Sequence, residues 1–448
     1  MARARPPGSS GRDVLIFIEN TPRAYAWGST DALAEMLGTE PTGEPQAELW
    51  LGTHPSSPAH VAQSTPEVQT LIDLVQADPD RYGVHGGPLP FLLKVLAIGA
   101  PLSLQVHPDL GQAAAGFAAE EAAGVPRDAR ERNYGDANHK PELLVALSEV
   151  TALSGFRPIS AARRDLLQLA GEAREASRFE GADALARAAE QLAGQDPEVQ
   201  RRGFLNWAFG EDPAVAVAVT EIATLLAEPD TANRSDGPGA EVSAVAGRAD
   251  RGATIVSERR RALRALVRAH PGDPGVLVSL LLHLVSLAPG EALFLPARQL
   301  HAYLGGIAVE VMASSDNVLR AGLTEKHVDI AELCRVVDTV EVAEPRFACQ
   351  ALEPGLVAWR PGITDFQLMR ARLCDPDERD ETECAPSVEV GANHPIVLVV
   401  TAGRVRVERP TAGIAEVATA RRGQSLYVSA GEPIRLSGAG EVFLATVG

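Results

Sequence analysis

A helix-rich block interrupts the strand-type segments of this chain, and this interruption limits the folds that the chain can adopt. Before residue 159, short apolar runs such as 89–97 and 102–109 are separated by turns that contain Gly or Pro, a pattern typical of a β-sandwich. Residues 160–270 are instead rich in Ala, Arg, Leu and Glu at helical spacing. Because strand-type runs resume at 277–287, the sequence predicts a mainly β domain with a helical insertion.

The same patterns predict the domain boundaries. Segments rich in Gly, Pro and polar residues cannot bury enough apolar surface to order, so they predict a tail and a mobile loop. Short strands with turns predict a further β-sandwich near the C-terminus. We therefore expect a disordered tail over 1–13, a β domain over 14–158 and 271–345, a helical insertion over 159–270 with a mobile loop over 228–252, and a second β domain over 346–448.

Local turn signals predict how some strands connect. The runs 89–97 and 102–109 are joined by Gly99-Ala100-Pro101 and are expected to form a hairpin. The pair Gly305-Gly306 is expected to be a turn between strands 302–304 and 307–312. The apolar run 277–287 is expected to be a single strand.

Composition excludes several classes of partner. The formal net charge is −18, which disfavours binding to nucleic acid or to an anionic membrane. No apolar run approaches the roughly 20 residues that span a bilayer, and the first residues lack the apolar core of a secretory signal. The four Cys show no CxxC pairing, as expected of reduced thiols in the cytosol. We therefore predict a cytoplasmic protein with no nucleic-acid or membrane partner.

The run LSLQVHPD, residues 102–109, carries half of a possible metal site. Gln105 and His107 are two residues apart, so in a strand both project from one face, while Leu104 and Val106 project from the other. By the same alternation Ser103 shares the face of Gln105. An amide oxygen beside an imidazole nitrogen is half of a nitrogen and oxygen ligand set.

Two further segments offer the other half of that site. Glu142 opens an apolar strand directly after His139 and Lys140, and His301 opens another strand after a Pro-containing loop. Two imidazoles, a carboxylate and an amide oxygen without thiolate suit zinc, and manganese, cobalt or iron could take the same set. Spacing alone leaves open whether the ligands converge.

Several polar residues occur where apolar ones are expected. Only three of the 41 basic residues are Lys; one of them, Lys94, interrupts a buried run, so it either meets an anion in a pocket or extends to solvent. Glu310 lies among apolar residues of another strand. Trp27 beside a Gly turn fits either a pocket mouth or a core. His54, before a Pro, fits a turn better than a site.

These residues belong to motifs that resemble the type I mannose-6-phosphate isomerases of the cupin superfamily. The motifs are YAWGS, AELWLGTHPSSPA, PFLLKVLAIGAPLSLQVHPD, NYGDANHKPELLVAL, LSGFRP and LHAYLGGIAVEVMASSDNVLRAGLTEKHVDI, in residues 23–158 and 275–333. The resemblance implies a cupin-type jelly-roll sandwich with a helical insertion and a second, cupin-like C-terminal sandwich. It also implies a monomer in carbohydrate metabolism that interconverts mannose 6-phosphate and fructose 6-phosphate through a cis-enediol.

The resemblance also assigns residues to roles. It implies one zinc per subunit, held by Gln105, His107, Glu142 and His301. It implicates Lys140 and Arg320 in catalysis, with His139 as a second candidate for proton handling. The expected sugar-phosphate pocket includes Trp27, Lys94, Ser103, Glu310 and Asp316.

One departure and three alternatives stay open. Many members have Gly where this chain has Arg298, so we expect a differently shaped loop and an added positive charge at the pocket rim. A hydride shift at the metal would use the same ligands as proton transfer. A non-catalytic sugar-phosphate sensor and a cupin dioxygenase are the other function classes, although the complete ligand set and the Gln ligand disfavour them. Four protein ligands would close a tetrahedral site, so substrate binding requires a fifth position.

Overall fold

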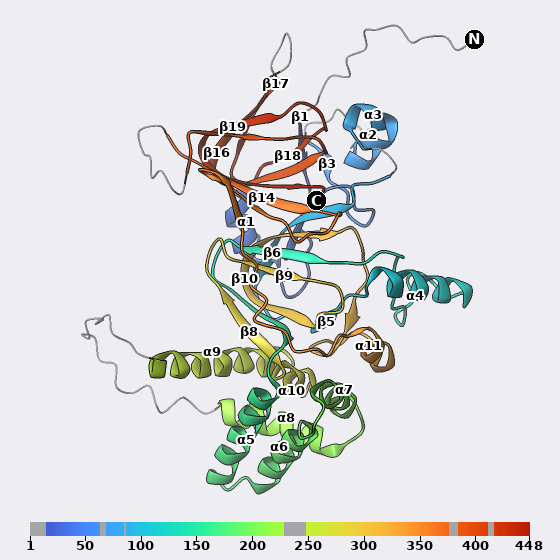
Figure 1. Ribbon diagram of the computed structural model, residues 1–448, viewed down its shortest axis with the longest axis vertical. Helices are drawn as coiled ribbons and strands as arrows, with labels where there is room; N and C mark the ends of the chain where they lie inside the picture. The colour runs from blue at the N-terminus through green and yellow to red at the C-terminus, as the bar shows by residue number, and fades with distance from the viewer. Residues whose placement is uncertain (1–14, 63–68, 85–86, 228–247, 376–383, 411–415) are drawn as a thin grey trace, which may run out of the picture.

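The computed structural model describes residues 15–62, 69–84, 87–227, 248–375, 384–410 and 416–448. These residues form three tiers along the long axis of the molecule: the C-terminal sheet, a second sheet that carries β10, and a helical tier (Figure 1). The tail predicted over 1–13 lies outside the described residues. So does most of the loop predicted over 228–252, whereas 248–252 form the start of a helix and not a loop.

The second sheet, called the site sheet below, is organised around β10. Among the described residues it has nine strands, and β10 pairs with β4, β5, β6 and β7. All of these pairings are antiparallel. The strands are β2 (Glu48–Leu51), β4 (Phe91–Ile98), β5 (Gln105–Val106), β6 (Glu142–Ala146), β7 (Val150–Phe156), β8 (Leu282–Leu287), β9 (Ala292–Leu295), β10 (His301–Ala313) and β11 (Leu319–Arg320).

The C-terminal sheet has ten strands among the described residues. Its first strand in the sequence, β1, pairs with β18, so the N-terminal strand joins this sheet although it begins the predicted catalytic segment 14–158. The domain boundaries themselves stay a prediction. The strands are β1 (Leu15–Glu19), β3 (His60–Val61), β12 (Gln350–Glu353), β13 (Leu356–Trp359), β14 (Gln367–Leu373), β15 (Ser387–Val390), β16 (Ile396–Arg409), β17 (Glu416–Arg421), β18 (Ser425–Val428) and β19 (Ile434–Thr446).

Alternation along the strands divides each sheet between two cores. In β4, Leu93 and Val95 point to an apolar core that also contains Val397 and Phe443 of the C-terminal sheet. The intervening side chains point to the opposite face, which is the interior of the site sheet. Because both faces of β4 are buried, its sequence is a nearly continuous apolar run.

The helical tier packs against the far side of the site sheet. Its core continues into Leu104 and Val106, so the alternation predicted around Gln105 is present. No helix among the described residues is long and apolar enough to cross a membrane. The tier contains α5 (Ile159–Glu175), α6 (Phe179–Gln191), α7 (Pro197–Ala208), α8 (Pro213–Ala227), α9 (Arg248–Ala269) and α10 (Gly275–Ser279). The other helices are α1 (Ala32–Leu37), α2 (Leu71–Ala77), α3 (Pro79–Tyr82), α4 (Leu110–Ala122) and α11 (Ile330–Val336).

The prediction of a mainly β chain with a helical insertion is confirmed, but three local predictions are wrong. The run 277–287 is split between α10 and β8. The strands β4 and β5 form no hairpin, because Ile98 pairs with Gly306 and Gln105 with His301, so both lie along the same partner strand. The Gly305-Gly306 pair is no turn: β10 runs through it, with a register shift between Tyr303 and Gly305.

The cysteines also differ from expectation. The sequence predicted reduced thiols, but Cys374 and Cys384 form a disulfide that spans a separation of ten residues. No CxxC spacing marks this pair, so only the fold brings the two sulfurs together. The free thiols are Cys334 and Cys349.

Candidate metal and substrate site

Strand register brings several charged side chains to one face of the site sheet. Lys94 in β4 lies opposite Glu310 in β10 and opposite Trp50 in β2. On the other side of β10, Met312 lies opposite Glu142 of β6. Residues directly opposite in neighbouring strands project to the same side. These side chains therefore meet in the interior of the sheet, although they are far apart in the sequence.

A cavity of about 690 Å³ opens over this face. His107 and His301 are 1% and 0% exposed, and the Nε2 atom of each lies within 4 Å of the carboxylate of Glu142, which lines the cavity. Most of the other residues that the sequence suggested line the cavity too: Trp27, Lys94, Ser103, Gln105, Lys140, Glu310, Asp316 and Arg320.

Three of the four proposed ligands form a compact group. Nε2 of His107 is 3.2 Å from one carboxylate oxygen of Glu142, and Nε2 of His301 is 3.5 Å from the other. One nitrogen or oxygen atom from each residue lies within 4.8 Å of the others. Gln105, the fourth, pairs in register with His301 and lines the cavity. The atoms of His107, Glu142 and His301 are spaced as they would be around one ion.

The tautomers of the two histidines are fixed by backbone carbonyls. Nδ1 of His107 is 2.7 Å from the carbonyl oxygen of Asn317, and Nδ1 of His301 is 2.9 Å from that of Gln299. Since a carbonyl only accepts, each Nδ1 carries the proton and each Nε2 keeps a lone pair. Both Nε2 atoms are buried without a hydrogen-bond partner. Buried acceptors beside a carboxylate are satisfied by a cation, so this donor set fits zinc.

The surrounding charges keep the proposed ligands in protonation states that can bind a cation. Burial by itself would raise the pKa of Glu142, but Lys140, 3.1 Å away, and His107 hold this pKa well below its usual range. Burial and the charge of Lys140 lower the pKa of His107 to about 4. At neutral pH the carboxyl group is therefore ionised and His107 is neutral, as metal ligation requires.

A second buried cluster surrounds Lys94. Its ammonium lies 3.4 Å from Glu310 and 3.8 Å from Glu48, and 4.8 Å from the ring centre of Trp50. Burial would lower the pKa of Lys94, but the two carboxylates raise it above its ordinary value. Burial and Glu142 raise the pKa of Glu310 to about 7. The anions that Lys94 meets are thus the side chains of the protein itself.

Tyr303 links this cluster to the proposed ligands. Its hydroxyl donates to Glu310 at 2.9 Å and lies 3.4 Å from Glu142. Burial and both carboxylates raise the pKa of Tyr303 well above its ordinary value, so the hydroxyl stays a donor.

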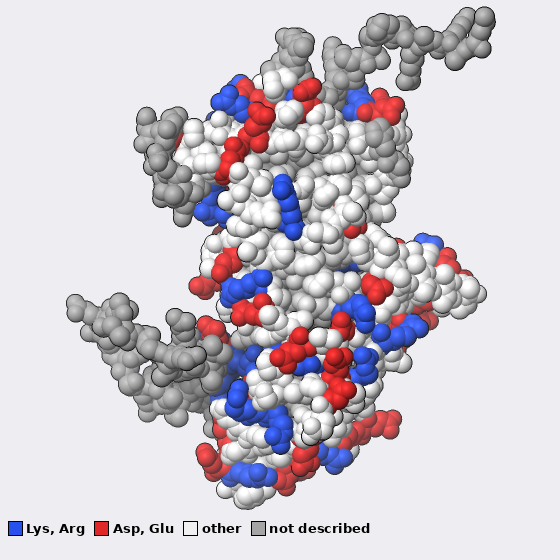
Figure 2. Space-filling view, in the orientation of Figure 1, with Lys and Arg blue, Asp and Glu red and all other residues white. Residues whose placement is uncertain are grey.

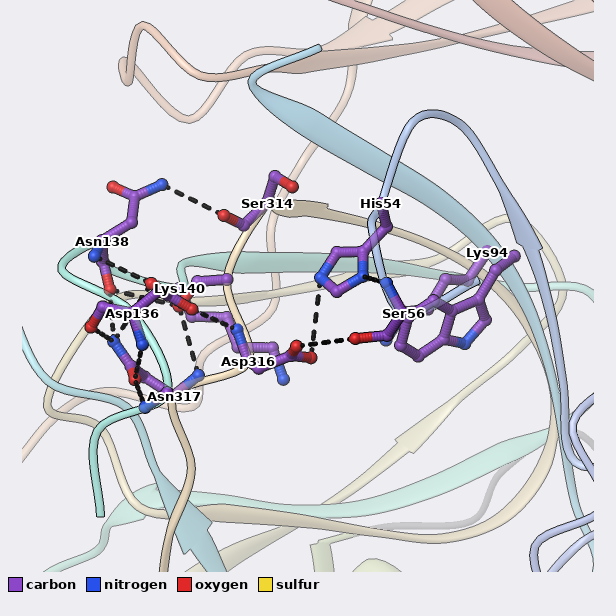
Figure 3. A network of polar contacts seen from close by, with 12 residues as sticks. His54, Ser56, Lys94, Asp136, Asn138, Lys140, Ser314, Asp316 and Asn317 are labelled. Carbon is purple, nitrogen blue, oxygen red and sulfur yellow. Dashed lines mark hydrogen bonds and ion pairs between the residues drawn. The ribbon is translucent and has the colours of Figure 1, made fainter. Parts of the chain in front are cut away.

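A polar network holds two loops of the site together. Figure 3 shows Asp136, Asn138 and Asn317 gathered on one side of Asp316. The amide of Asn317 donates to the carbonyl oxygen of Asn138 at 2.7 Å and to that of Asp136 at 2.8 Å, and it accepts from the backbone of Gly135 at 2.8 Å. The same residue orients His107 through its carbonyl. One fully buried asparagine therefore ties the segment before Glu142 to the segment after β10.

Asp316 extends this network to the segment that follows β2. Its carboxylate lies 3.5 Å from Nε2 of His54 and accepts from the hydroxyl of Ser56 at 3.1 Å (Figure 3). His54 is 4% exposed. Burial lowers its pKa, and the charge of Asp316 opposes this shift.

The structure does not bring every suggested residue to the cavity. Nε2 of His139 lies 3.1 Å from the carboxylate of Asp365, and His139 is not among the cavity-lining residues. Arg298 does not line the cavity either, so the positive charge expected at its rim is not found there. Its guanidinium donates to the carbonyl of Val336 at 3.1 Å. Arg298 has φ 70°, a conformation that Gly adopts easily, so the backbone keeps the shape that Gly would favour.

Sequence reasoning missed several cavity residues. Lys326 faces the cavity with Arg320, and burial together with the charge of Arg320 lowers its pKa. Glu48, Trp50 and Tyr303 also line the cavity. Tyr303 follows His301 by two residues, so the alternation that linked Gln105 to His107 could have identified it.

Comparisons with known proteins agree with this site. A family model for the phosphomannose isomerase type I catalytic domain matches residues 15–159. Mannose-6-phosphate isomerase of Escherichia coli K12 is 39% identical over 324 residues, which cover 70% of this chain and 72% of that protein. The Mus musculus protein of the same name is 31% identical over 430 residues, 92% of each chain.

Solved structures are similar over nearly the whole chain. A zinc-bound mannose 6-phosphate isomerase has a TM-score of 0.77 and 30% identity, over 97% of this chain and 99% of the other. A phosphomannose isomerase mutant from Salmonella typhimurium gives the same values.

Proposed function

Because this chain belongs to the type I mannose-6-phosphate isomerase family, we propose that its cavity interconverts mannose 6-phosphate and fructose 6-phosphate through a cis-enediol. One observation carries the proposal. A buried group of two imidazoles and a carboxylate, with both Nε2 atoms lacking hydrogen-bond partners, borders a cavity that also contains lysine and arginine. An aldose–ketose isomerisation needs those two parts: a site for the sugar oxygens and cations for the phosphate.

We propose zinc as the cofactor, one ion per chain, held by Gln105, His107, Glu142 and His301. The donor set and the zinc-bound relative support this assignment. When bound, zinc supplies Lewis-acid polarisation of the substrate carbonyl. The carbonyls behind His107 and His301 keep both Nε2 atoms directed toward Glu142.

Arg320 and Lys326 are proposed to bind the phosphate, with Ser103 as a hydroxyl donor. Both cations line the cavity, and burial lowers the pKa of each. A dianion between them would restore the preference for the charged forms. In a partly buried cleft these contacts are screened less than the surface field of a protein with net charge −18.

Lys140 is proposed to exchange the proton between C1 and C2. It lines the cavity and lies 3.1 Å from Glu142, so it borders the place where the sugar oxygens would sit. Arg320 would stabilise negative charge on the enediol as well as bind phosphate. His139 could take part only after its ring leaves Asp365. The pair of Lys94 and Glu310, with Tyr303, would hold the floor of the pocket in place, and Trp27 and Asp316 would border the sugar.

An isomerase assay with chelator and zinc add-back tests the proposal. We expect the chelated protein to lose activity and zinc to restore it. Gln105→Leu should weaken zinc retention, whereas Gln350→Leu, on the exposed strand β12, should not. Lys140→Ala should lower kcat with zinc content retained. Full activity of the chelated protein would refute metal dependence.

Deuterium exchange separates proton transfer from a hydride shift. Proton transfer through Lys140 predicts incorporation of solvent deuterium at C2 of the mannose 6-phosphate that forms from fructose 6-phosphate. Complete retention of the original hydrogen over the whole pH range would favour a hydride shift.

We also propose a monomer that works in the cytoplasm. The Cys374–Cys384 bond weighs against a reducing compartment, because disulfides are rare in the cytosol. Sedimentation of the enzyme and thiol titration in fresh cell extract test both points; four titratable thiols would mean that the pair is reduced there.

A further inference from the structure

A second cavity, of about 220 Å³, lies where the helical tier meets the site sheet and shares no lining residue with the first cavity. It is bordered by α5, α9 and the end of β7, and four arginines line it: Arg157, Arg164, Arg259 and Arg260. On the face drawn in Figure 2, basic side chains gather where α9 approaches α5 and α10. None of these residues belongs to the proposed catalytic site.

A single carboxylate, Asp165, stands between two of these arginines. Nη2 of Arg157 donates to it at 2.5 Å, and Nε of Arg259 lies 3.8 Å from the same oxygen. Each guanidinium is also held by a backbone carbonyl, at 2.8 Å to Leu280 for Arg157 and 3.3 Å to Leu282 for Arg259. Both cations are therefore fixed beside one another.

The charges of this cavity do not balance. Arg260 pairs with Glu172 at 2.9 Å, whereas Arg164 has no ion-pair partner among the described residues. Arg157 and Arg259 thus share Asp165, and the solvent-exposed Arg164 adds a third positive charge at the cavity. Burial, together with the charge of Arg157, lowers the pKa of Arg259 to about 10. Burial also lowers the pKa of Arg157, and the charge of Arg164 contributes to that shift.

Arg157 is buried and Arg259 is partly buried, and like charges withdrawn from water in this way cost free energy unless an anion compensates them. Guanidinium groups bind phosphate through two parallel hydrogen bonds, which a lysine cannot do. We infer that this cavity is a second anion site, which binds the phosphate group of a small molecule between Arg157, Arg164 and Arg259. The cavity has room for a phosphate with a small organic group but for nothing as large as a nucleotide.

The proposed anion site lies between α9 and β7, so a bound anion would connect these two elements. Arg157 directly follows β7, and in β7 Ser154 pairs with His301 of β10. An anion between Arg157 and Arg259 would fasten α9 to the strand next to a proposed zinc ligand. Bound anion should therefore raise the melting temperature of the enzyme.

Equilibrium dialysis of the zinc-loaded enzyme with radiolabelled inorganic phosphate tests this inference. We expect two bound phosphates per chain, one in the catalytic cavity and one in the helical tier. Arg164→Gln combined with Arg259→Gln should remove one of them, or weaken it at least about 10-fold, with kcat unchanged. Arg163→Gln is the matched control, since Arg163 is an exposed neighbour that does not line the cavity. Equal stoichiometry in the double variant and the wild type would overturn the inference.

Asp165→Asn separates an anion site from a purely structural ion pair. If the cavity binds anions, loss of the repelling carboxylate should tighten phosphate binding by at least about 5-fold, although the protein loses an ion pair. If Asp165 only ties the arginines together, the variant melts at a lower temperature and binds phosphate no better, which would refute the site. A competition arm with glucose 6-phosphate identifies the source: tighter binding than inorganic phosphate at this site indicates a phosphorylated metabolite, and equal binding indicates free phosphate.

Discussion

The two β-sheets share one apolar core, but on their other faces they differ: the site sheet buries several charged side chains beside its apolar ones, and the C-terminal sheet buries mainly apolar ones. The site sheet turns Glu48, Lys94, Glu142 and Glu310 to its interior, all of them 9% exposed or less. The corresponding core of the C-terminal sheet consists of aliphatic residues such as Leu398 and Leu444. The fold itself therefore does not require charges in its interior.

Burying the charges of the site sheet costs free energy, and ion-pair partners reduce this cost. A buried ion pair seldom stabilises a fold more than apolar residues of the same size would, and breaking one is strongly destabilising. In the site sheet Lys94 has two carboxylate partners, and Glu142 has Lys140. The described residues of the C-terminal sheet bury one charged side chain, Arg409, which donates to Ser429. We infer that the site sheet is arranged for chemistry and that the C-terminal sheet supplies stability.

The largest effect is expected from a substitution in the charged interior of the site sheet. His301→Ala removes a proposed zinc ligand, so kcat/KM should fall by at least about 10³-fold, the equivalent of several kcal/mol of transition-state stabilisation. Zinc content, measured on the purified protein, should fall with it. His394→Ala changes an exposed histidine near β16 and should leave both unchanged. A His301→Ala enzyme that keeps a tenth of its activity would contradict the ligand assignment.

The next largest effect is expected from a substitution in the apolar core of the C-terminal sheet. Leu398→Ala opens a cavity at a fully buried position, so the free energy of unfolding should drop by about 2–5 kcal/mol. Urea denaturation measures this change. Below the transition, kcat per folded molecule should equal that of the wild type. A fall in kcat in the folded range would mean that the C-terminal sheet shapes the site directly.

A smaller effect is expected from a substitution in the loops that hold the proposed metal site together. Asn317→Ala removes five hydrogen-bond contacts of the side chain and leaves the carbonyl that accepts from His107 on a less constrained loop. We expect zinc affinity to fall about 10–100-fold, the usual effect of losing a group that orients a ligand. Competition with a fluorescent zinc chelator gives the affinity. Asn393→Ala, at an exposed position, is the control, and equal affinity in both variants would remove Asn317 from this role.

The smallest effect concerns pH. Burial lowers the pKa of His54 below the ordinary 6.5, so the unfolded chain takes up a proton at a pH where the folded protein does not. The contribution of His54 to stability is therefore complete above pH 6.5 and is lost as the pH falls below that value, by at most about 1.4 kcal/mol per pH unit. His54→Gln should flatten the fall in the urea midpoint between pH 7 and 5. An unchanged slope, equal to that of His394→Gln, would show that His54 does not contribute.

Local patterns determined much of this protein from the sequence alone. The helical spacing over 160–270 and the alternation around Gln105 and His107 are properties of residues a few positions apart, and the structure has both. The resemblance of whole motifs then suggested zinc ligands in three separate segments, although the sequence does not show how those segments meet in space. Tyr303 was within reach of the same alternation argument but was not identified.

Tertiary structure decided what depends on segments far apart in the chain. The pairing of β10 with β4, β5 and β6 sets which polar side chains share one cavity, and no local pattern encodes that register. The ring of His139 contacts the carboxylate of Asp365, which lies 226 residues further along the chain. Cys374 forms a disulfide with Cys384, although the separation of ten residues carries no disulfide spacing signal. Local periodicity reports which face a side chain occupies, but only long-range packing decides which other side chains that face will meet.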